Sequence, residues 1–387
     1  MSSAVLRRGL SLAALAVAAV LAGCAANNAE VEAEAARLAA EAEARARMPR
    51  PIALNDSVAQ AASVYVAFTR DMAAVRGGFD SPEAIQAALR RGAAYDPGQI
   101  SRGLVAYASI LALQSPEFVA GVGQYSVDPT IREKLIADIV AEPRAASYVP
   151  GADVAAGLII SVLDADIDAL SAAANSVEND AYTIQASHDP RRSWAVAHIT
   201  DREARLASAK ALSDQMMLPS AEEAARLFAA GNSGAGLGVS GGRRRDPPYP
   251  PAVTQALALA ALAALGAAGD NARATTDALQ AEPVSQTCLS LSKLMLFQCL
   301  AASRPSYEDM FCIGRHIVRD IATCAKGAAM PAAIVTVSDL DVAASEPPRP
   351  TIVTAPLDPP PPAQSPPAAS ETERLNSGTG ARPAPED

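Results

Sequence analysis

Residues 288–324 read CLSLSKLMLFQCLAASRPSYEDMFCIGRHIVRDIATC and contain four of the five cysteines of the chain. Cys288 and Cys299 are 11 residues apart, and Cys312 and Cys324 are 12 residues apart. Such separations span roughly 16–18 Å along an α-helix, which rises about 1.5 Å per residue. Disulfide-bonded cysteines have Cα atoms within about 7 Å of each other, so neither pair can bond within one helix.

A turn between these two pairs allows the cysteines of one helix to face those of the next. Arg304-Pro305-Ser306-Tyr307 is typical of a break between two helices. In an antiparallel hairpin, residues that face each other have a nearly constant sum of positions. The position numbers of Cys299 and Cys312 add to 611, and those of Cys288 and Cys324 add to 612. We therefore predict a helical hairpin with the nested disulfides Cys299–Cys312 and Cys288–Cys324.

Two other states of the four cysteines stay open from the sequence: free buried thiols and a zinc site. Structural zinc usually takes cysteines in closely spaced pairs such as Cys-x2-Cys, and this segment has none. We therefore expect no metal ion and no cofactor. The pattern resembles the small disulfide-stapled helical hairpins with twin Cys-x9-Cys segments, although the spacings here are Cys-x10-Cys and Cys-x11-Cys. This resemblance is architectural and implies no function.

The composition of the whole chain also favours helices. Of the 387 residues, 50% are hydrophobic but only 4% are aromatic, and alanine makes up much of the hydrophobic share. Alanine is the best helix former because it loses no side-chain entropy, whereas a β-sandwich needs more β-branched and aromatic residues. We therefore predict an all-α protein. The formal net charge of −10 argues against a nucleic-acid partner, because Lys and Arg bind phosphates.

Residues 55–230 are predicted to form a bundle-like helical domain. A recurring helix start, in which Ser or Asp precedes Pro, occurs at Ser81, Asp96, Ser115 and Asp128. Proline suits the first helical position because its missing amide hydrogen would be unpaired there anyway. Ser57 is a further candidate for a helix cap, at the start of the first helix.

Apolar periodicity extends this pattern along the chain. It predicts one long helix from Pro150 to about Ile184 and a further helix over residues 194–206. Helical periodicity returns over residues 252–330, which include the cysteine hairpin. Between these regions, residues 231–251 read GNSGAGLGVSGGRRRDPPYPP and are predicted to be a linker or an exposed loop.

The first 24 residues have the three parts of a signal peptide. Arg7 and Arg8 supply positive charge, Leu10–Ala22 form an apolar stretch, and Leu21-Ala22-Gly23-Cys24 ends it. The apolar stretch is too short for a transmembrane helix, which needs about 20 residues, and it suits the hydrophobic region of a signal peptide. We therefore assign residues 1–23 to a signal peptide.

The last four of these residues resemble the lipobox of bacterial lipoproteins. In that family the cysteine receives a diacylglyceryl group, the peptide is cut in front of it, and the new amino terminus is acylated. The resemblance implies that Cys24 is lipidated and anchors the chain in a membrane. Ala25, where retained lipoproteins have Asp, implies the outer membrane facing the periplasm, with the inner membrane as the alternative. An ordinary secretory signal and a twin-arginine signal at Arg7-Arg8 are the other interpretations.

The ends of the mature chain differ from its middle. Residues 24–54 contain the lipid anchor and the Ala/Glu-rich segment 29–47, which is predicted to form a solvated tether helix or, alternatively, a coiled coil. Residues 331–387 are rich in Pro, Ser, Ala and Thr and are predicted to be a disordered tail. Export to an oxidising compartment favours disulfides over free thiols at Cys288, Cys299, Cys312 and Cys324.

Two short patterns match catalytic motifs only in part. Gly238-Val239-Ser240-Gly241-Gly242 matches G-x-S-x-G, but the flanking sequence lacks the strand and the helix of a nucleophile elbow. Ser290 and Lys293 match the S-x-x-K segment of penicillin-binding proteins, but the partner motifs of that family are missing. A flexible loop and a helical core segment explain these residues better, so we assign no catalytic residue.

Asp164, Asp166 and Asp168 resemble the opening of an EF-hand loop. The sixth position of that loop would be Ala169, where Gly is needed, and the twelfth would be Asn175 instead of Glu. We therefore prefer a solvated acidic helix face to a calcium site.

His188, His198 and His316 do not have the spacing of a metalloprotease motif. Cys312 and His316 are one helical turn apart and form a candidate ligand pair, for which core packing is the preferred explanation. Arg243, Arg244 and Arg245 are candidates to contact lipid phosphates, but a solvated loop explains them as well.

From these features we expect a lipid-anchored protein of the cell envelope with a structural, scaffold or binding role. Its partners would be the membrane, through Cys24, and another envelope protein or peptidoglycan. An envelope hydrolase that acts on peptidoglycan or lipid is the alternative function.

Overall fold

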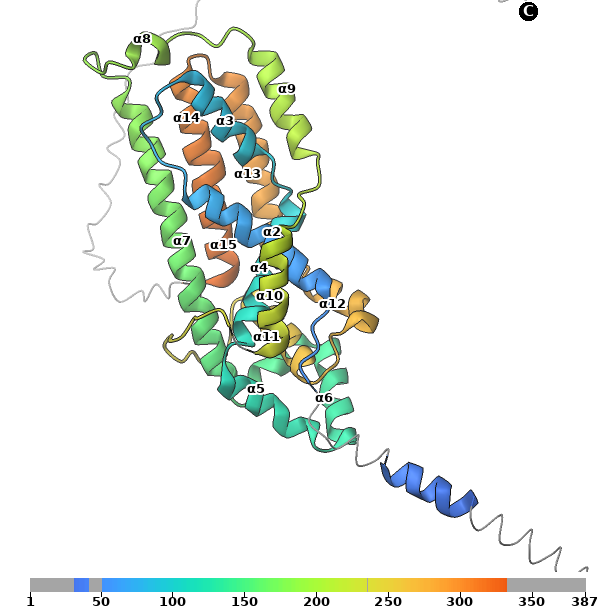
Figure 1. Ribbon diagram of the computed structural model, residues 1–387. Coiled ribbons are helices and arrows are strands. Elements are labelled where there is room, and N and C mark those ends of the chain that lie inside the picture. Colours follow the sequence, from blue (N-terminus) through green and yellow to red (C-terminus); the bar gives the residue numbers. More distant parts are fainter. Residues whose placement is uncertain (1–30, 42–50, 235, 333–387) are drawn as a thin grey trace, which may run out of the picture. The chain divides into compact units, whose positions relative to one another are not determined.

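The computed structural model describes residues 31–41, 51–234 and 236–332. Within these ranges the protein is all-α, as predicted, and the only β contacts are two isolated bridges (Figure 1). Residues 1–23, which are predicted to be a signal peptide, lie outside the described residues, as do Cys24 and residues 333–387 of the predicted tail. The predictions made for these residues therefore stay predictions. Residues 31–41 form a helix with exposed side chains.

The helices described after residue 50 are joined by connections that are mostly short, apart from the long one between α10 and α11. They are α2 (Asp56–Ala73), α3 (Pro82–Ala93), α4 (Pro97–Ala112), α5 (Pro116–Gly123), α6 (Pro129–Ala141), α7 (Ala152–Thr183), α8 (Arg192–Ala195), α9 (Arg202–Ser213), α10 (Ala221–Ser233), α11 (Pro251–Ala264), α12 (Arg273–Leu279), α13 (Pro283–Ala302), α14 (Ser306–Ile313) and α15 (Asp320–Ala329). A π-helical segment, η4 (Gly314–Arg319), joins α14 to α15 without a break. Short 3-10 turns lie at Gln124–Ser126, Pro143–Tyr148 and Asp270–Ala272.

The Ser-Pro and Asp-Pro pairs begin helices α3, α4, α5 and α6 as predicted. In each case the side-chain oxygen before the proline accepts a hydrogen bond from a backbone amide of the first turn. The four capping residues are Ser81, Asp96, Ser115 and Asp128. Such caps satisfy amides that the helix itself leaves without partners.

Two predictions about helices are wrong: the residue that precedes α2, and the continuity of the helix over residues 194–206. Asn55, and not Ser57, precedes α2, because the Asn55 side chain is fixed by hydrogen bonds to Ala268 O and Thr276 Oγ1 at 3.0 and 2.9 Å. Residues 194–206 contain a break instead of one helix. There the amide of Ile199 donates to Arg304 O at 2.8 Å, a tertiary hydrogen bond that replaces a helical one.

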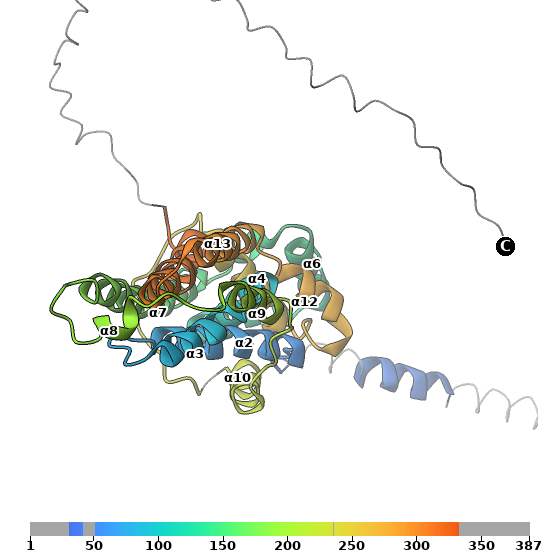
Figure 2. The same ribbon diagram turned by 90° about the horizontal axis from the view of Figure 1, so that it is seen from above.

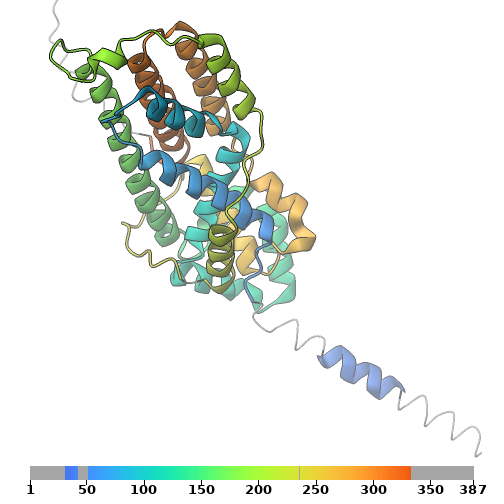
Figure 3. The ribbon, with the colours of Figure 1, turned by 45° about the horizontal axis from the view of Figure 1, so that its top comes forward.

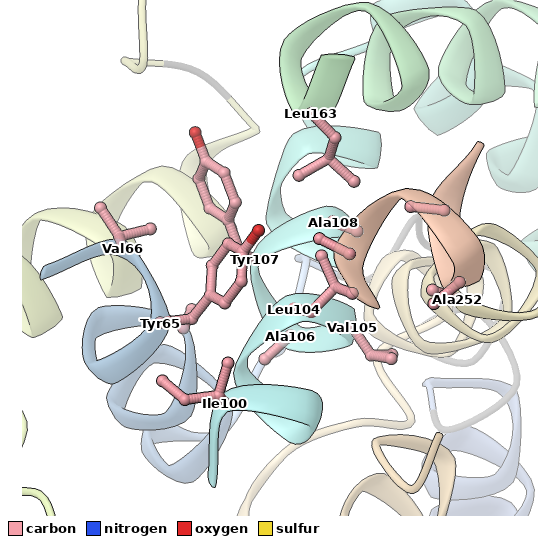
Figure 4. Close-up of a cluster of buried hydrophobic side chains, with 14 of the residues drawn as sticks. Tyr65, Val66, Ile100, Leu104, Val105, Ala106, Tyr107, Ala108, Leu163 and Ala252 are labelled. Atoms are coloured by element: carbon pink, nitrogen blue, oxygen red, sulfur yellow. The ribbon is translucent and has the colours of Figure 1, made fainter. Parts of the chain in front are cut away.

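Helix α4 lies at the centre of the core and packs against α2, α7, α11 and α13. Figure 4 shows its side chains directed toward Tyr65 of α2 on one side and toward Leu163 of α7 and Ala252 of α11 on the other. Gly103 of α4 allows α2 to pack closely against α4, because a Cβ at this position would lie 2.5 Å from Ala61 O of α2. The Tyr65 and Tyr107 rings pack beside this crossing, with centroids 6.1 Å apart.

The glycine-rich connection between α10 and α11 is tied to α7. The Arg245 amide donates to Asp153 O at 3.1 Å, and the Arg244 guanidinium pairs with the Asp153 carboxylate at 2.9 Å. A Cβ on Gly157 would lie 2.3 Å from Arg243 O, so glycine is needed for this close approach. Helices before and after the connection contribute to one buried cluster of apolar side chains.

Helices α13 and α14–α15 form the predicted antiparallel hairpin, and both predicted disulfides are present. The Cα atoms of Cys288 and Cys324 are 5.6 Å apart, and those of Cys299 and Cys312 are 5.8 Å apart. The hairpin packs against α7 and α9, as Figures 1 and 2 show from two directions. In Figure 2, α10 lies on the opposite side of α2 and α4 from α13.

A buried ion pair holds α9 against the hairpin. Arg205 Nη1 lies 2.7 and 2.8 Å from the two carboxylate oxygens of Asp309, and both side chains are buried. Asp309 also accepts hydrogen bonds from Ser303 Oγ and Gln86 Nε2, each at 2.7 Å. Arg205 further donates to Leu300 O. Buried charges are tolerated when paired and hydrogen-bonded in this way, so the network ties α3, α9 and both hairpin helices together.

Removing either disulfide is expected to destabilise the protein by a different amount. The outer bridge joins residues separated by 36 positions and the inner bridge joins residues separated by 13. The chain-entropy model assigns about 4 kcal/mol to the outer loop and about 3 kcal/mol to the inner one. In urea denaturation, the pair Cys288→Ala with Cys324→Ala should therefore lower the free energy of unfolding more than Cys299→Ala with Cys312→Ala. A larger loss for the inner pair would contradict this order.

Candidate binding surface

The G-x-S-x-G pattern does not form a nucleophile elbow. Ser240 is exposed in the connection between α10 and α11, and no helix begins until Pro251. Residues 236–239, directly before Ser240, form no strand. The serine therefore lacks the sharp strand-to-helix turn that exposes a nucleophile above an oxyanion hole.

The two residues of the S-x-x-K pattern lie in different environments, the serine at the surface and the lysine in the interior. Ser290 is exposed on α13 and its hydroxyl donates to Gln286 O at 2.8 Å. Lys293 is buried, and its ammonium group contacts Tyr95 O, approaches Ser213 O at 3.4 Å, and lies 4.3 Å from the centre of the Tyr95 ring. Ser290 and Lys293 therefore do not form a nucleophile and base pair. Burial lowers the pKa of Lys293 to about 8, against the opposing effect of Asp96 and Asp214.

The Asp164–Asp168 segment belongs to the continuous helix α7 and forms no calcium loop. Asp164 and Asp168 are exposed, whereas Asp166 is half-buried beside Arg70 and Tyr107. Burial raises the pKa of Asp166, and the charge of Arg70 acts in the opposite direction. The cavity of about 50 Å³ at this point is large enough for water only.

The candidate ligand pair Cys312 and His316 is not formed. Cys312 is bonded to Cys299, and the His316 ring lies 3.4 Å from the Asp320 carboxylate on the same helix. Within the ranges described above, no three His, Cys, Asp or Glu side chains gather as metal ligands. His198 lies at the hairpin turn, where its backbone forms a bridge with Pro305.

The outward-facing side of α13 is the feature that sequence reasoning missed. Val284, Leu291, Leu294 and Met295 are 52%, 58%, 51% and 38% exposed. Their spacing places them in one stripe along the helix, because residues seven, three and four positions apart share a face. We name these four residues the α13 face; the helix that carries it is visible in Figure 3.

The α13 face has no charged residue. Lys293 is the only charged residue between Pro283 and Ala302, and its side chain is buried. Surface helices of soluble proteins normally carry charged residues on their solvent side, so an uncharged one is unusual. The exposed polar side chains beside these apolar ones are Thr287, Ser290 and Gln298. The signal was present in the sequence, since 20 residues with one charge stand out in a chain that is 19% charged.

Two further apolar side chains, Met216 and Leu218, are 79% and 87% exposed in the connection that follows α9. The connection follows Ser213, the last residue of α9, whose carbonyl group approaches the Lys293 ammonium group of α13. Exposed apolar side chains are common singly, but a stripe of them indicates a surface that contacts another molecule.

Comparison with known proteins gives no relative. No family model matches the chain, and neither a curated protein nor a solved structure matches it. Among the residues that the structure describes, no single helix is long and apolar enough to span a membrane. Pro97–Ala112 and Pro116–Ser126 meet the criteria only together, as a pair bent by 82°.

Lys293 is expected to make stability depend on pH above neutrality. Its pKa is about 8 in the folded protein, below the ordinary value of 10.5. Between these pH values the unfolded chain binds more protons at this site than the folded chain, so the free energy of unfolding rises with pH. Urea denaturation of wild type and Lys293→Met at pH 7 to 10 measures this effect. The free energy of unfolding of the wild type should rise relative to that of the variant as pH rises. A difference between the two proteins that stays constant from pH 7 to 10 would contradict this prediction.

Proposed function

We propose that this protein is a lipid-anchored accessory protein of the bacterial cell envelope that binds another envelope protein through the α13 face. The uncharged, exposed apolar stripe on α13 is the observation that carries the binding role. The lipobox-like Leu21-Ala22-Gly23-Cys24 supports the anchor. The two disulfides support an oxidising compartment, because stable disulfides are rare in the cytosol.

The chemistry of the α13 face favours a protein as the partner over peptidoglycan. Burial of apolar surface contributes roughly 25 cal/mol per Å² when the opposite surface is also apolar. The centres of protein interfaces are poor in charge, as this face is. A glycan offers mainly hydroxyl groups, and Leu291, Leu294 and Met295 offer no hydrogen-bond partners to them. Only the uncharged Thr287, Ser290 and Gln298 beside these residues do so among the exposed side chains nearby on α13.

The alternative hydrolase gains no support from the site geometry. The two sequence patterns that match hydrolase motifs, at Ser240 and at Ser290, lack a base and the required local fold. We therefore do not propose a catalytic role.

One set of strains tests both the anchor and the binding role. The cells produce wild type or Cys24→Ala, each with a photo-crosslinking amino acid at Leu291 or, as a control, at the exposed Asp71 of α2. A palmitate analogue should label the wild type and leave Cys24→Ala unlabelled. Equal labelling of both proteins would refute lipidation at Cys24.

Irradiation of the same cells should give a discrete protein adduct from position 291 and none from position 71. The adduct should weaken when Leu294→Lys is added, because a buried lysine in the interface opposes binding. Adducts of equal intensity from both positions, or an adduct that Leu294→Lys leaves unchanged, would contradict binding through the α13 face.

A further inference from the structure

A second candidate site lies at the turn of the hairpin, apart from the α13 face. A cavity of about 490 Å³ opens between this turn and the connection from α7 to α9. Figures 1 and 3 show this connection passing over the end of the hairpin. The volume falls within the range of roughly 300–1,000 Å³ that is usual for small-molecule sites. The lining includes Arg192, Val196, His198, Arg304, Tyr307 and Glu308.

Hydrogen bonds to backbone carbonyl groups hold together the segments that flank this cavity. The Ile199 amide donates to Arg304 O at 2.8 Å, and Arg202 donates to Ser303 O and Ala301 O at 2.8 and 2.6 Å. Arg202 thereby satisfies carbonyl groups that the end of α13 leaves unpaired. The Cys299–Cys312 disulfide holds the two helices on either side of the turn. The backbone around the site is therefore fixed before a ligand binds, which lowers the entropy cost of binding, whereas the side chains of Arg192 and Arg304 are exposed.

The side chains of the cavity combine positive charge with apolar walls. The Arg304 side chain has no hydrogen bond or ion pair with any residue that the structure describes. The backbone amide and the carbonyl group of Arg304 each form a hydrogen bond. Arg192 adds a second guanidinium group, which donates to Gln185 O. Glu308 is the one acidic residue of the lining, and its carboxylate is occupied as it accepts from the Arg304 amide at 2.7 Å.

We infer that this cavity binds a small organic anion, a carboxylate or a phosphate monoester. A guanidinium group donates two parallel hydrogen bonds to either group, which is why arginine is favoured for both. Two guanidinium groups against one carboxylate leave the site positive, and this excess selects an anion over a cation. Val196, Pro305 and the Tyr307 ring supply apolar surface for the uncharged part of the ligand. The inference does not depend on the α13 face or on lipidation.

Calorimetric titration of the full-length mature protein tests this site. The probes are N-acetyl-D-alanine for the carboxylate and glycerol 3-phosphate for the phosphate monoester. N-acetyl-D-alanine amide, which has no charge, is the control ligand. We expect one or both anions to bind and the amide to bind at least tenfold more weakly. The anion that binds more tightly identifies the ligand class.

Arg304→Gln is the decisive variant, because the backbone hydrogen bonds of residue 304 persist when its side chain changes. It should weaken anion binding about tenfold or more, as expected for the loss of a charge-assisted hydrogen bond. Arg315→Gln, at an exposed arginine of the same hairpin, is the matched control and should bind as the wild type does. Unchanged far-ultraviolet circular dichroism would show that both variants fold. Binding of neither anion at 10 mM, or equal binding by the two variants, would overturn the inference.

Discussion

The two nested disulfides fix the register of α13 against α14–α15, and the arrangement of the surrounding helices depends on that register. A single cross-link allows two helices to rotate about it, whereas two cross-links at Cys288–Cys324 and Cys299–Cys312 allow neither rotation nor sliding. Leu289, Leu296 and Leu300 are thereby held toward the core. The same register places Asp309 where Arg205 of α9 can pair with it.

The fixed hairpin presents two different surfaces, and each follows from the same geometry. Because one side of α13 is held in the core, the opposite side must face outward, and there it carries apolar residues without charge. Because the turn is closed by Cys299–Cys312 and by the Ile199–Arg304 hydrogen bond, the side chains of Arg304 and Tyr307 line a preformed cavity. The first surface is the proposed site for another protein, and the second is the proposed site for a small anion. Neither requires a change of conformation to be accessible.

Local signals in the sequence were sufficient to predict much of this fold. The proline-led helix starts were predictable because a cap depends on residues three positions apart, as at Asp96 and Gln99. The disulfide pairing was predictable because helix geometry excludes the other partners. The break after Ala195 was not predictable, because it depends on a hydrogen bond between residues 199 and 304. The Arg205–Asp309 pair joins residues 104 positions apart and leaves no local pattern. The α13 face did leave a local signal, since residues 283–302 contain a single charge, but which of its apolar residues face outward depends on the packed molecule. The cavity at the hairpin turn joins residues far apart in the sequence and leaves no such signal.

The pairing of the four cysteines in protein taken from cells is the most direct test of this structure. Peptide mapping under non-reducing conditions, after free thiols are blocked during lysis, should give two cross-linked species: Cys288 with Cys324, and Cys299 with Cys312. Cys288 joined to Cys312, or four free thiols, would contradict the hairpin register. The positions assigned to the α13 face and to the anion cavity would then be wrong as well.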